Sequence, residues 1–316
     1  MPIQCHENLL SPGCILFSFL LAAATGVQAQ IPTKDDLQHQ IDSDEKLLEA
    51  AKASAASPLQ LGRLYLRLST LEQDAGELAH AEQNFNNAIR SLQTAPVSLP
   101  DLTAAIDGLG TLYLQMGSVE EAERAELKAL SLREQSSEKA DIARSCIHLA
   151  TLYLVKHRAS LALAYAKQAI EDLSSTKTPS PEDNIAARLS LALSLSWLHQ
   201  YSNAIDTLHE ALRLMKDLYG PDDFPIGFAT FLLGYTHWKA GDCVQAGELM
   251  KQGADSLSRQ LGWWSPDYCS IMTCYARFLR TTGQKPAASA IERNLRSARS
   301  AFPNERRNQT LAAAIH

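Results

Sequence analysis

The residues best suited to catalysis or metal binding are dispersed along this chain of 316 residues. The pair His209-Glu210 begins like a zinc-binding helix motif, but Arg213 stands where the second histidine would be. The sequence contains no GxSxG nucleophile motif and no glycine-rich phosphate loop. We therefore predict that the protein is not an enzyme, and we assign no catalytic residue, no metal ligand and no cofactor.

Binding chemistry is concentrated toward the C-terminal end of the chain. Four aromatic residues recur there at intervals of three and four, so a helix would gather them on one side, apart from its packing side. Tyrosine and tryptophan are typical anchors of protein interfaces, and basic residues follow in the next helical segment. We predict a surface that binds a bulky apolar group and an acidic group, formed by Phe228, Phe231, Tyr235, Trp238, Arg277 and Arg280. The alternative is that the aromatic residues pack between neighbouring elements and the arginines are only solvated.

A repeat of 40–42 residues supplies the elements that must position these side chains. Thirteen residues before the alanine that marks each unit stands a leucine or tyrosine, and the residue after it is always small. Each unit also contains two runs with helical periodicity. We predict antiparallel helix pairs that approach closely at the small residues and stack, because one pair cannot bury its apolar faces alone. The marker residues are Ala81, Ala122, Ala162, Ala204, Ala246 and Ala288.

A turn separates the two helices of each unit, five residues before the marker alanine. Glycine ends a helix at low cost because it adopts the left-handed conformation readily. Prolines fall almost entirely between the units, where they do not interrupt a helix. The turn position holds Gly76, Gly117, Gly241 and Gly283 in four units, and His157 and His199 in the other two.

Two segments, LGTLYLQMGSVEEAERAELKAL (109–130) and LLGYTHWKAGDCVQAGELMKQG (232–253), resemble tetratricopeptide repeats. The step of about 42 residues and the junction LYGPDDFPIG (218–227) resemble the longer repeats of the kinesin light chain type. The resemblance covers residues 58–300. Glu126 and Glu292 depart from it, because the family usually has a bulky apolar residue at this position.

The resemblance implies an all-α fold, a right-handed superhelical solenoid of stacked antiparallel helix pairs with about six units. The first helix of each unit would line a concave face, which in this family commonly holds a peptide. Family members that clamp a terminal carboxylate use lysine and asparagine on this face. Threonines replace that chemistry here, as Thr70, Thr111 and Thr151, so we do not predict a carboxylate clamp.

Carboxylates could still build a hydrolytic site on such a face, and this remains a minor alternative. It would need clustered acids, and we place only Asp74 and Asp107 there. The acidic run of Glu121, Glu123 and Glu126 is most simply a solvated helix face.

The first thirty residues differ in character from the rest. Ile15–Ala24 is an uncharged apolar run, and a small-x-small triplet ends at Ala29. We predict a signal peptide over 1–29, cut after Ala29, and hence a periplasmic or secreted protein. No Lys or Arg precedes the run, so an uncleaved anchor and a cytosolic protein both remain open. The other predicted parts are an N-terminal segment (30–57) with a capping helix over Asp44–Ala55, the solenoid (58–300) and a C-terminal tail (301–316).

Four cysteines would remain after cleavage, Cys146, Cys243, Cys269 and Cys274. All fall in segments that we interpret as helix or helix start, which favours free thiols, although an exported protein permits disulfides.

The net charge of −6 argues against nucleic acid as a partner, since that role favours a basic face. The leading interpretation is an exported scaffold that binds a protein or peptide of unknown identity on the concave face. The alternative is a periplasmic chaperone or envelope assembly factor that holds apolar client segments.

Overall fold

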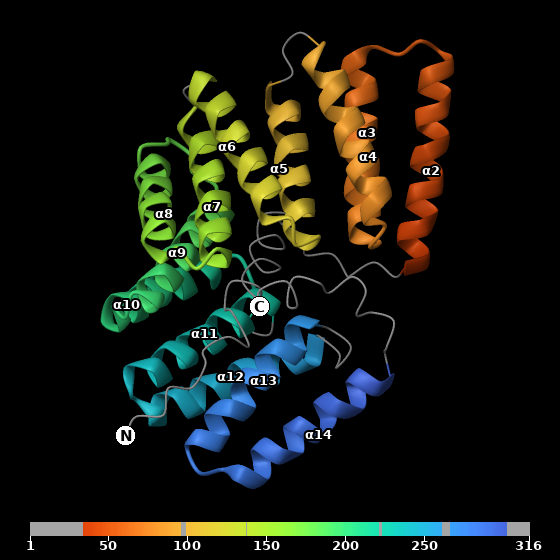
Figure 1. Ribbon diagram of the computed structural model, residues 1–316. Helices are drawn as coiled ribbons and strands as arrows, with labels where there is room; N and C mark the ends of the chain where they lie inside the picture. The colour runs from red at the N-terminus through yellow and green to blue at the C-terminus, as the bar shows by residue number, and fades with distance from the viewer. Residues whose placement is uncertain (1–33, 96–98, 137, 221–222, 261–265, 302–316) are drawn as a thin grey trace. The chain divides into compact units, whose positions relative to one another are not determined.

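The computed structural model describes residues 34–95, 99–136, 138–220, 223–260 and 266–301, and the regular elements in these ranges are all α-helices (Figure 1). Helix α2 (Lys34–Ala53) is followed by six helix pairs, which confirms the all-α fold and the six units predicted from the repeat. The pairs are α3 (Pro58–Asp74) with α4 (Leu78–Gln93), α5 (Leu99–Gln115) with α6 (Val119–Ser136), α7 (Lys139–Val155) with α8 (Ala159–Ser174), α9 (Pro181–Trp197) with α10 (Tyr201–Met215), α11 (Phe224–Ala240) with α12 (Cys243–Gln260), and α13 (Pro266–Thr281) with α14 (Lys285–Ala301).

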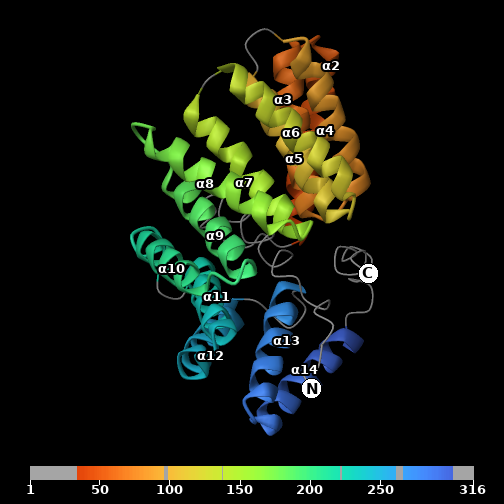
Figure 2. The ribbon, with the colours of Figure 1, turned by 60° about the vertical axis from the view of Figure 1, so that its left-hand side comes forward.

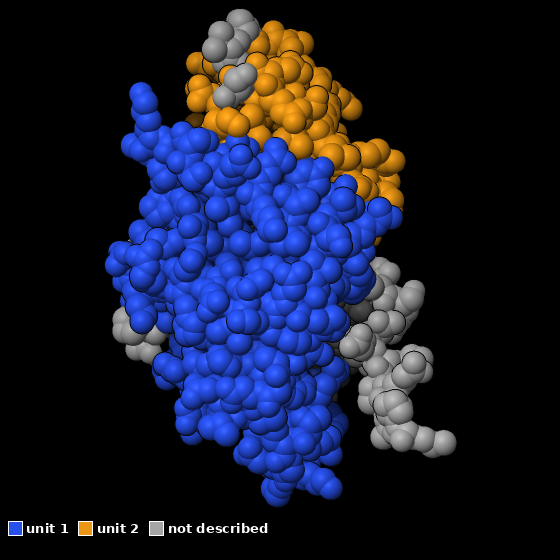
Figure 3. Space-filling view, turned by 90° about the vertical axis from the view of Figure 1, so that its left-hand side faces the viewer, with its two compact units in different colours: residues 1–26, 146–316 blue, residues 27–145 orange. Residues whose placement is uncertain are grey.

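The described residues fall into two compact units, which Figure 3 colours separately. The N-terminal unit extends to Ser145, partway along α7, and the C-terminal unit begins at Cys146. Within each unit, every helix packs against the next one in the chain, from α2 to α6 in the first and from α8 to α14 in the second (Figure 2). This is the stacking of helix pairs that the repeat predicts.

Several predicted segments lie at or beyond the limits of the described residues. The signal peptide (1–29) lies outside them, as does the C-terminal tail after Ala301. The capping helix begins earlier than predicted, at Lys34, because Leu37, Ile41 and Leu48 form a longer buried side. No helix among the described residues has both the length and the apolar character needed to cross a membrane.

Prolines and serines at the unit junctions start several of the helices. Ser57 caps α3 by accepting a hydrogen bond from the amide of Gln60, while the Gln60 side chain accepts one from the amide of Ser57. Pro58 then occupies the first turn, where the missing amide hydrogen costs nothing. Ser180 and Pro181 start α9 in a similar way.

The turn inside each unit has the left-handed conformation at the predicted position. The four glycines have φ between 78° and 94°. His157 and His199, which depart from glycine in sequence, adopt the same conformation, with φ of 55° and 60°. The turn geometry is therefore kept in all six units, at a cost of about 1–2 kcal/mol for each histidine relative to a right-handed residue.

Small residues allow the two helices of a unit to approach closely. All six marker alanines are 0% exposed, as the repeat requires. In the pair α11 and α12, the small residue at the helix contact is a glycine on both helices, Gly234 on α11 and Gly253 on α12. A Cβ added at Gly234 would lie 2.6 Å from the backbone nitrogen of Met250, and one at Gly253 would lie 2.6 Å from that of Phe231. Backbone therefore meets backbone here, which leaves no room for even a methyl group.

Candidate partner-binding surface

Phe228 and Phe231, the first half of the predicted aromatic row, lie in the interior of the C-terminal unit. They are 4% and 5% exposed. Phe228 stacks on Phe224 of the same helix, with 6.3 Å between ring centroids. Phe231 lies against Gly253 of α12, which approaches because it has no side chain. The exposure predicted for these two residues is wrong, because they belong to the packing of the unit.

Tyr235 and Trp238, the second half of the row, remain half-buried at the C-terminal part of α11. Their rings meet edge to face, with 6.0 Å between centroids. Trp238 also meets Phe278 of α13 edge to face at 5.7 Å, and Tyr275 stacks on Phe278 at 6.3 Å. Such pairs contribute about 0.5–1.5 kcal/mol each beyond their buried area. This aromatic cluster joins α11 to α13 and leaves part of Tyr235 and Trp238 accessible to solvent.

The two predicted arginines of α13 are both exposed but differ in their partners. Arg280 donates from Nη2 to both carboxylate oxygens of Glu292 on α14, at 2.7 and 2.6 Å, and from Nε at 3.1 Å. This contact raises the pKa of Arg280 and lowers that of Glu292. Arg277 forms no ion pair with any acid in the part of the chain that the structure describes. The two arginines therefore differ in how much charge they offer to a partner.

Lys239 is a further exposed cation on α11, and it is not among the site residues predicted from the sequence. It directly follows Trp238 on α11. Burial raises the pKa of the Cys274 thiol on α13 to about 12, while the positive charges of Arg277 and Lys239 act in the opposite direction. Both cations are therefore close enough to act on one thiol. Lys239 could have been identified from the sequence, because it directly follows Trp238.

Comparison with known proteins agrees with the repeat. The family model described as tetratricopeptide repeat matches residues 102–139, which include most of α5 and all of α6. The chain has a tetratricopeptide-repeat fold. Among the curated proteins, none matches the sequence.

Solved structures of low sequence identity share this fold. BtubC (BKLC) from P. vanneervenii is 19% identical, with 72% of this chain and 92% of that chain covered and a TM-score of 0.60. A Rap protein complexed with competence and sporulation factor is 14% identical, with coverage of 86% and 79% and a TM-score of 0.57. PilW, a type IV pilus biogenesis factor, is 18% identical, with coverage of 80% and 98% and a TM-score of 0.55. At these identities the similarity concerns the fold alone.

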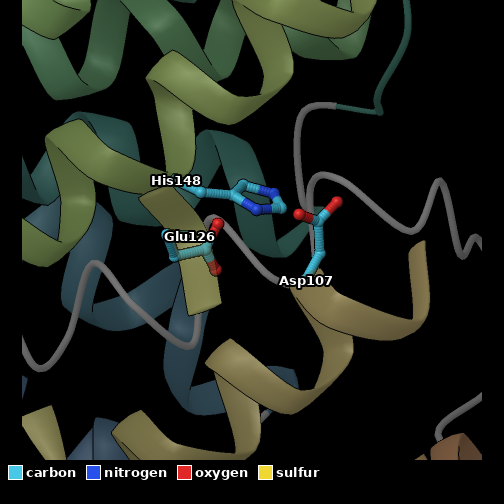
Figure 4. A group of neighbouring side chains, drawn as sticks. All are labelled: Asp107, Glu126 and His148. Carbon is cyan, nitrogen blue, oxygen red and sulfur yellow. The ribbon is translucent and has the colours of Figure 1, made fainter. Parts of the chain in front are cut away.

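The tetratricopeptide repeat formed by α5 and α6 contains two buried acids, Glu126, which was predicted on a solvated helix face, and Asp107, which was predicted on the concave face. Glu126 is 2% exposed and Asp107 is 7% exposed, so neither belongs to a solvated face. Gly110 makes room for Glu126, because a Cβ at Gly110 would lie 2.6 Å from its Oε1. Figure 4 shows Asp107 on α5 and Glu126 on α6, together with His148, which belongs to the C-terminal unit.

Asp107 is held by a buried arginine. Arg133 of α6 donates to both of its carboxylate oxygens, one at 3.1 Å, and also donates to Ser145 Oγ at 2.6 Å. The side chains of Arg133 and Asp107 are only 4% and 10% exposed. This pair stabilises the packing of the repeat, and it removes Asp107 from the acids that could have formed a hydrolytic site.

The four cysteines that follow the predicted signal peptide are not joined to one another by disulfides. Cys146 is buried and Cys243 is exposed at the first position of α12. Cys269 and Cys274 both lie on α13, where the helix holds them apart. The repeats are therefore held together by packing and polar contacts, as the helical positions of the cysteines suggested.

Proposed function

We propose that this protein is an exported scaffold that binds a protein or peptide partner through its C-terminal unit. The observation that carries the proposal is the α11–α13 surface, which we define as Tyr235, Trp238 and Arg277. Tyr235 and Trp238 are half-exposed on α11, and Trp238 contacts Phe278 of α13; Arg277 on α13 is exposed and forms no ion pair among the described residues. Tryptophan, tyrosine and arginine are the residues most enriched among those that dominate binding energy at protein interfaces.

The surface is already organised for binding. Trp238 meets both Phe278 and Tyr235 edge to face, and these two contacts restrict its rotamer before a partner arrives. A preorganised side chain loses less conformational entropy on binding than a free one. Phe228 and Phe231 contribute indirectly, because their burial holds α11 in place.

Two of the comparisons support a binding role without identifying the partner. One similar fold was solved as a complex with competence and sporulation factor, and another is a type IV pilus biogenesis factor. Export to the periplasm or beyond rests on the apolar run within residues 1–29. The proposal assigns no catalytic step and no cofactor to the chain.

Site-specific photo-crosslinking in the native cells tests the proposal. The full chain carries benzoylphenylalanine in place of Tyr235, or in place of Leu161 as the control, because Leu161 is 40% exposed on α8 of the same unit. We expect a small set of crosslinked proteins at position 235 that is absent at position 161. Equal crosslinking at both positions would overturn the assignment of the surface.

Two variants measure the contribution of the surface once a partner is captured. Trp238→Ala should weaken binding about 30-fold or more, since anchors of this kind contribute about 2 kcal/mol or more. Because Trp238 also packs on Phe278, Arg277→Glu serves as a variant that leaves the aromatic cluster intact. Circular dichroism checks that both stay helical. Capture of many unrelated apolar proteins would instead support the chaperone alternative.

A further inference from the structure

Charge is distributed unevenly along the chain. Residues 27–145, which make up the N-terminal unit, hold 19 acidic and 11 basic side chains, whereas residues 277–316 hold 8 basic and 2 acidic ones. The net charge of −6 is therefore the sum of an acidic first part and a basic last part. Charge separated in this way favours contact between the two parts of different molecules.

Helix α2 presents an acidic stripe to solvent. Its exposed acids recur at intervals of seven, three and four residues, so they follow one side of the helix. We define the acidic stripe as Asp35, Asp42, Glu45 and Glu49. Glu49 pairs with Lys52 at 2.7 Å, but no cation among the described residues forms an ion pair with the other three. Lys46 borders the stripe and offsets part of its charge, which leaves the stripe acidic overall.

Helix α14 presents a basic stripe to solvent. We define it as Lys285, Arg293 and Arg296, which are exposed and lie within about 80° of one another around the helix axis. None of the three forms an ion pair with an acid in the described part of the chain. Glu292, the only acid in the sequence of α14, is held by Arg280 at 2.6 Å and so compensates mainly that arginine.

Each stripe lies on a helix that packs closely against a single neighbour. Helix α2 packs on α3 and α14 packs on α13, whereas α3 and α13 each pack on the helix before and the helix after. Figure 1 shows α2 and α14 at the edges of their own units. The acidic stripe extends over about 21 Å and the basic stripe over about 16 Å, so their lengths match well enough for several charge pairs.

We propose that this protein self-associates, with the basic stripe of α14 in one copy docked on the acidic stripe of α2 in a second copy. The contact joins two different surfaces, so each copy keeps one stripe for a further copy. Exposed ion pairs are individually weak and are screened by salt, so the association should be weak and should strengthen as the salt concentration falls. Neither stripe includes Tyr235, Trp238 or Arg277, so this self-association is independent of the partner-binding proposal.

A second copy fits the charges better than a membrane or a nucleic acid does. Anionic headgroups or phosphates would attract the basic stripe but would repel most of a chain with a net charge of −6. A second copy supplies a counter-charge for both stripes at once, because each molecule carries one of each kind. Complementary charge of this type also fixes the orientation of the two partners.

Sedimentation velocity of the protein purified from the native cells tests the proposal. We expect the weight-average sedimentation coefficient to rise with protein concentration at about 20 mM salt, and to stay at the monomer value at about 0.5 M salt, where the screening length is only about 4 Å. A monomer at both salt concentrations, at every protein concentration up to about 0.5 mM, would refute self-association.

Two charge-reversal variants identify the surfaces involved. Arg293→Glu with Arg296→Glu makes both stripes acidic, and Asp42→Lys with Glu45→Lys makes both basic. Each variant alone should sediment as a monomer because its stripes repel, although the second change brings the net charge closer to zero. An equal mixture of the two should associate again, because the acidic α14 of one meets the basic α2 of the other.

A control variant separates this effect from that of net charge. Lys167→Glu with Lys251→Glu, at exposed positions of α8 and α12, changes the net charge as much as the α14 variant does and should associate like the native protein. Circular dichroism checks that all variants stay helical.

Four results would overturn the assignment of the stripes. Association retained by both reversal variants would place the contact elsewhere, and a mixture that stays monomeric would show that the two stripes do not meet. An equal loss in the control variant would reduce the effect to one of net charge. A native protein that stays monomeric but binds phosphatidylglycerol vesicles through Arg293 and Arg296 would make the basic stripe a membrane contact instead.

Discussion

Replacing Gly253 with alanine should destabilise the protein, although the repeat pattern favours alanine at this position. The equivalent residues of the four preceding units are Ala88, Ala129, Ala169 and Ala211. A new Cβ at Gly253 would lie 2.6 Å from Phe231 N and 2.7 Å from Gly227 O, and both are backbone atoms of α11 that no rotamer change can move. Helices α11 and α12 must therefore separate, and overpacking of this kind costs about 1–3 kcal/mol.

The net effect includes a gain in helix propensity of about 1 kcal/mol for alanine over glycine. We therefore expect a net loss of about 0–2 kcal/mol for Gly253→Ala, centred near 1 kcal/mol, which corresponds to a fall in Tm of about 2–4 °C for a chain of this size. Gly247→Ala is the matched control on the same helix, because its Cβ would meet only the Phe278 ring at 3.5 Å. That variant should gain about 0.5–1 kcal/mol.

Thermal and urea unfolding followed by circular dichroism at 222 nm compares the two variants with the native chain. The decisive quantity is the difference between them, about 2 kcal/mol in favour of Gly247→Ala, since the propensity term is common to both. If Gly253→Ala is as stable as Gly247→Ala, the close approach of α11 and α12 is not as described. The explanation given for the burial of Phe231 would then fail as well.

Three further substitutions or modifications test other contacts. Asp107→Ala should lower the free energy of unfolding by about 3–5 kcal/mol, because it leaves the Arg133 charge buried without its partner; a loss below 1 kcal/mol in urea unfolding would contradict this. Iodoacetamide at pH 8 should alkylate exposed Cys243 well before Cys274, whose pKa of about 12 leaves only about one thiolate in ten thousand; mass spectrometry of timed samples decides. Gly241→Ala should cost about 1–2 kcal/mol through its φ of 94° alone, since nothing lies within 4 Å of the new Cβ; an unchanged Tm would refute it.

The repeat could be predicted from sequence because each of its columns has a single physical role. A marker alanine at 0% exposure and a left-handed turn five residues before it recur wherever two helices of a pair meet. At two turns this geometry is kept without glycine, because His157 and His199 adopt the same left-handed conformation. Local geometry is imposed by the stacked units, so a weak local signal at one turn does not change the result.

The candidate surface was less predictable because helical periodicity does not say which neighbour covers a given side. Phe231 shares a helix side with Tyr235, yet α12 covers Phe231 through Gly253, a position far away in sequence. Glu126 and Glu292 occupy the same position of the repeat, where the family usually has a bulky apolar residue. Their environments differ, because Glu126 is buried beside Gly110 and Glu292 is paired with Arg280. Where a residue departs from the repeat pattern, its role is decided by the residues it contacts in the folded chain and not by its position in the repeat.

Arg280 offers the sharpest distinction between what the sequence predicts and what the structure adds. The sequence groups Arg280 with Arg277 as equal parts of one basic patch, which predicts similar losses of binding when either is replaced. In the structure Glu292 compensates the charge of Arg280, and of these two arginines Arg277 is the one with no ion pair among the described residues. For a partner captured through the α11–α13 surface, Arg277→Gln should weaken binding about two- to fivefold and Arg280→Gln less than that. Arg280→Gln also leaves Glu292 unpaired beside the surface, so a loss restored by the double change with Glu292→Gln would still agree with the structure. Equal losses that the double change does not restore would show that Arg280 itself contacts the partner, as the sequence alone predicts.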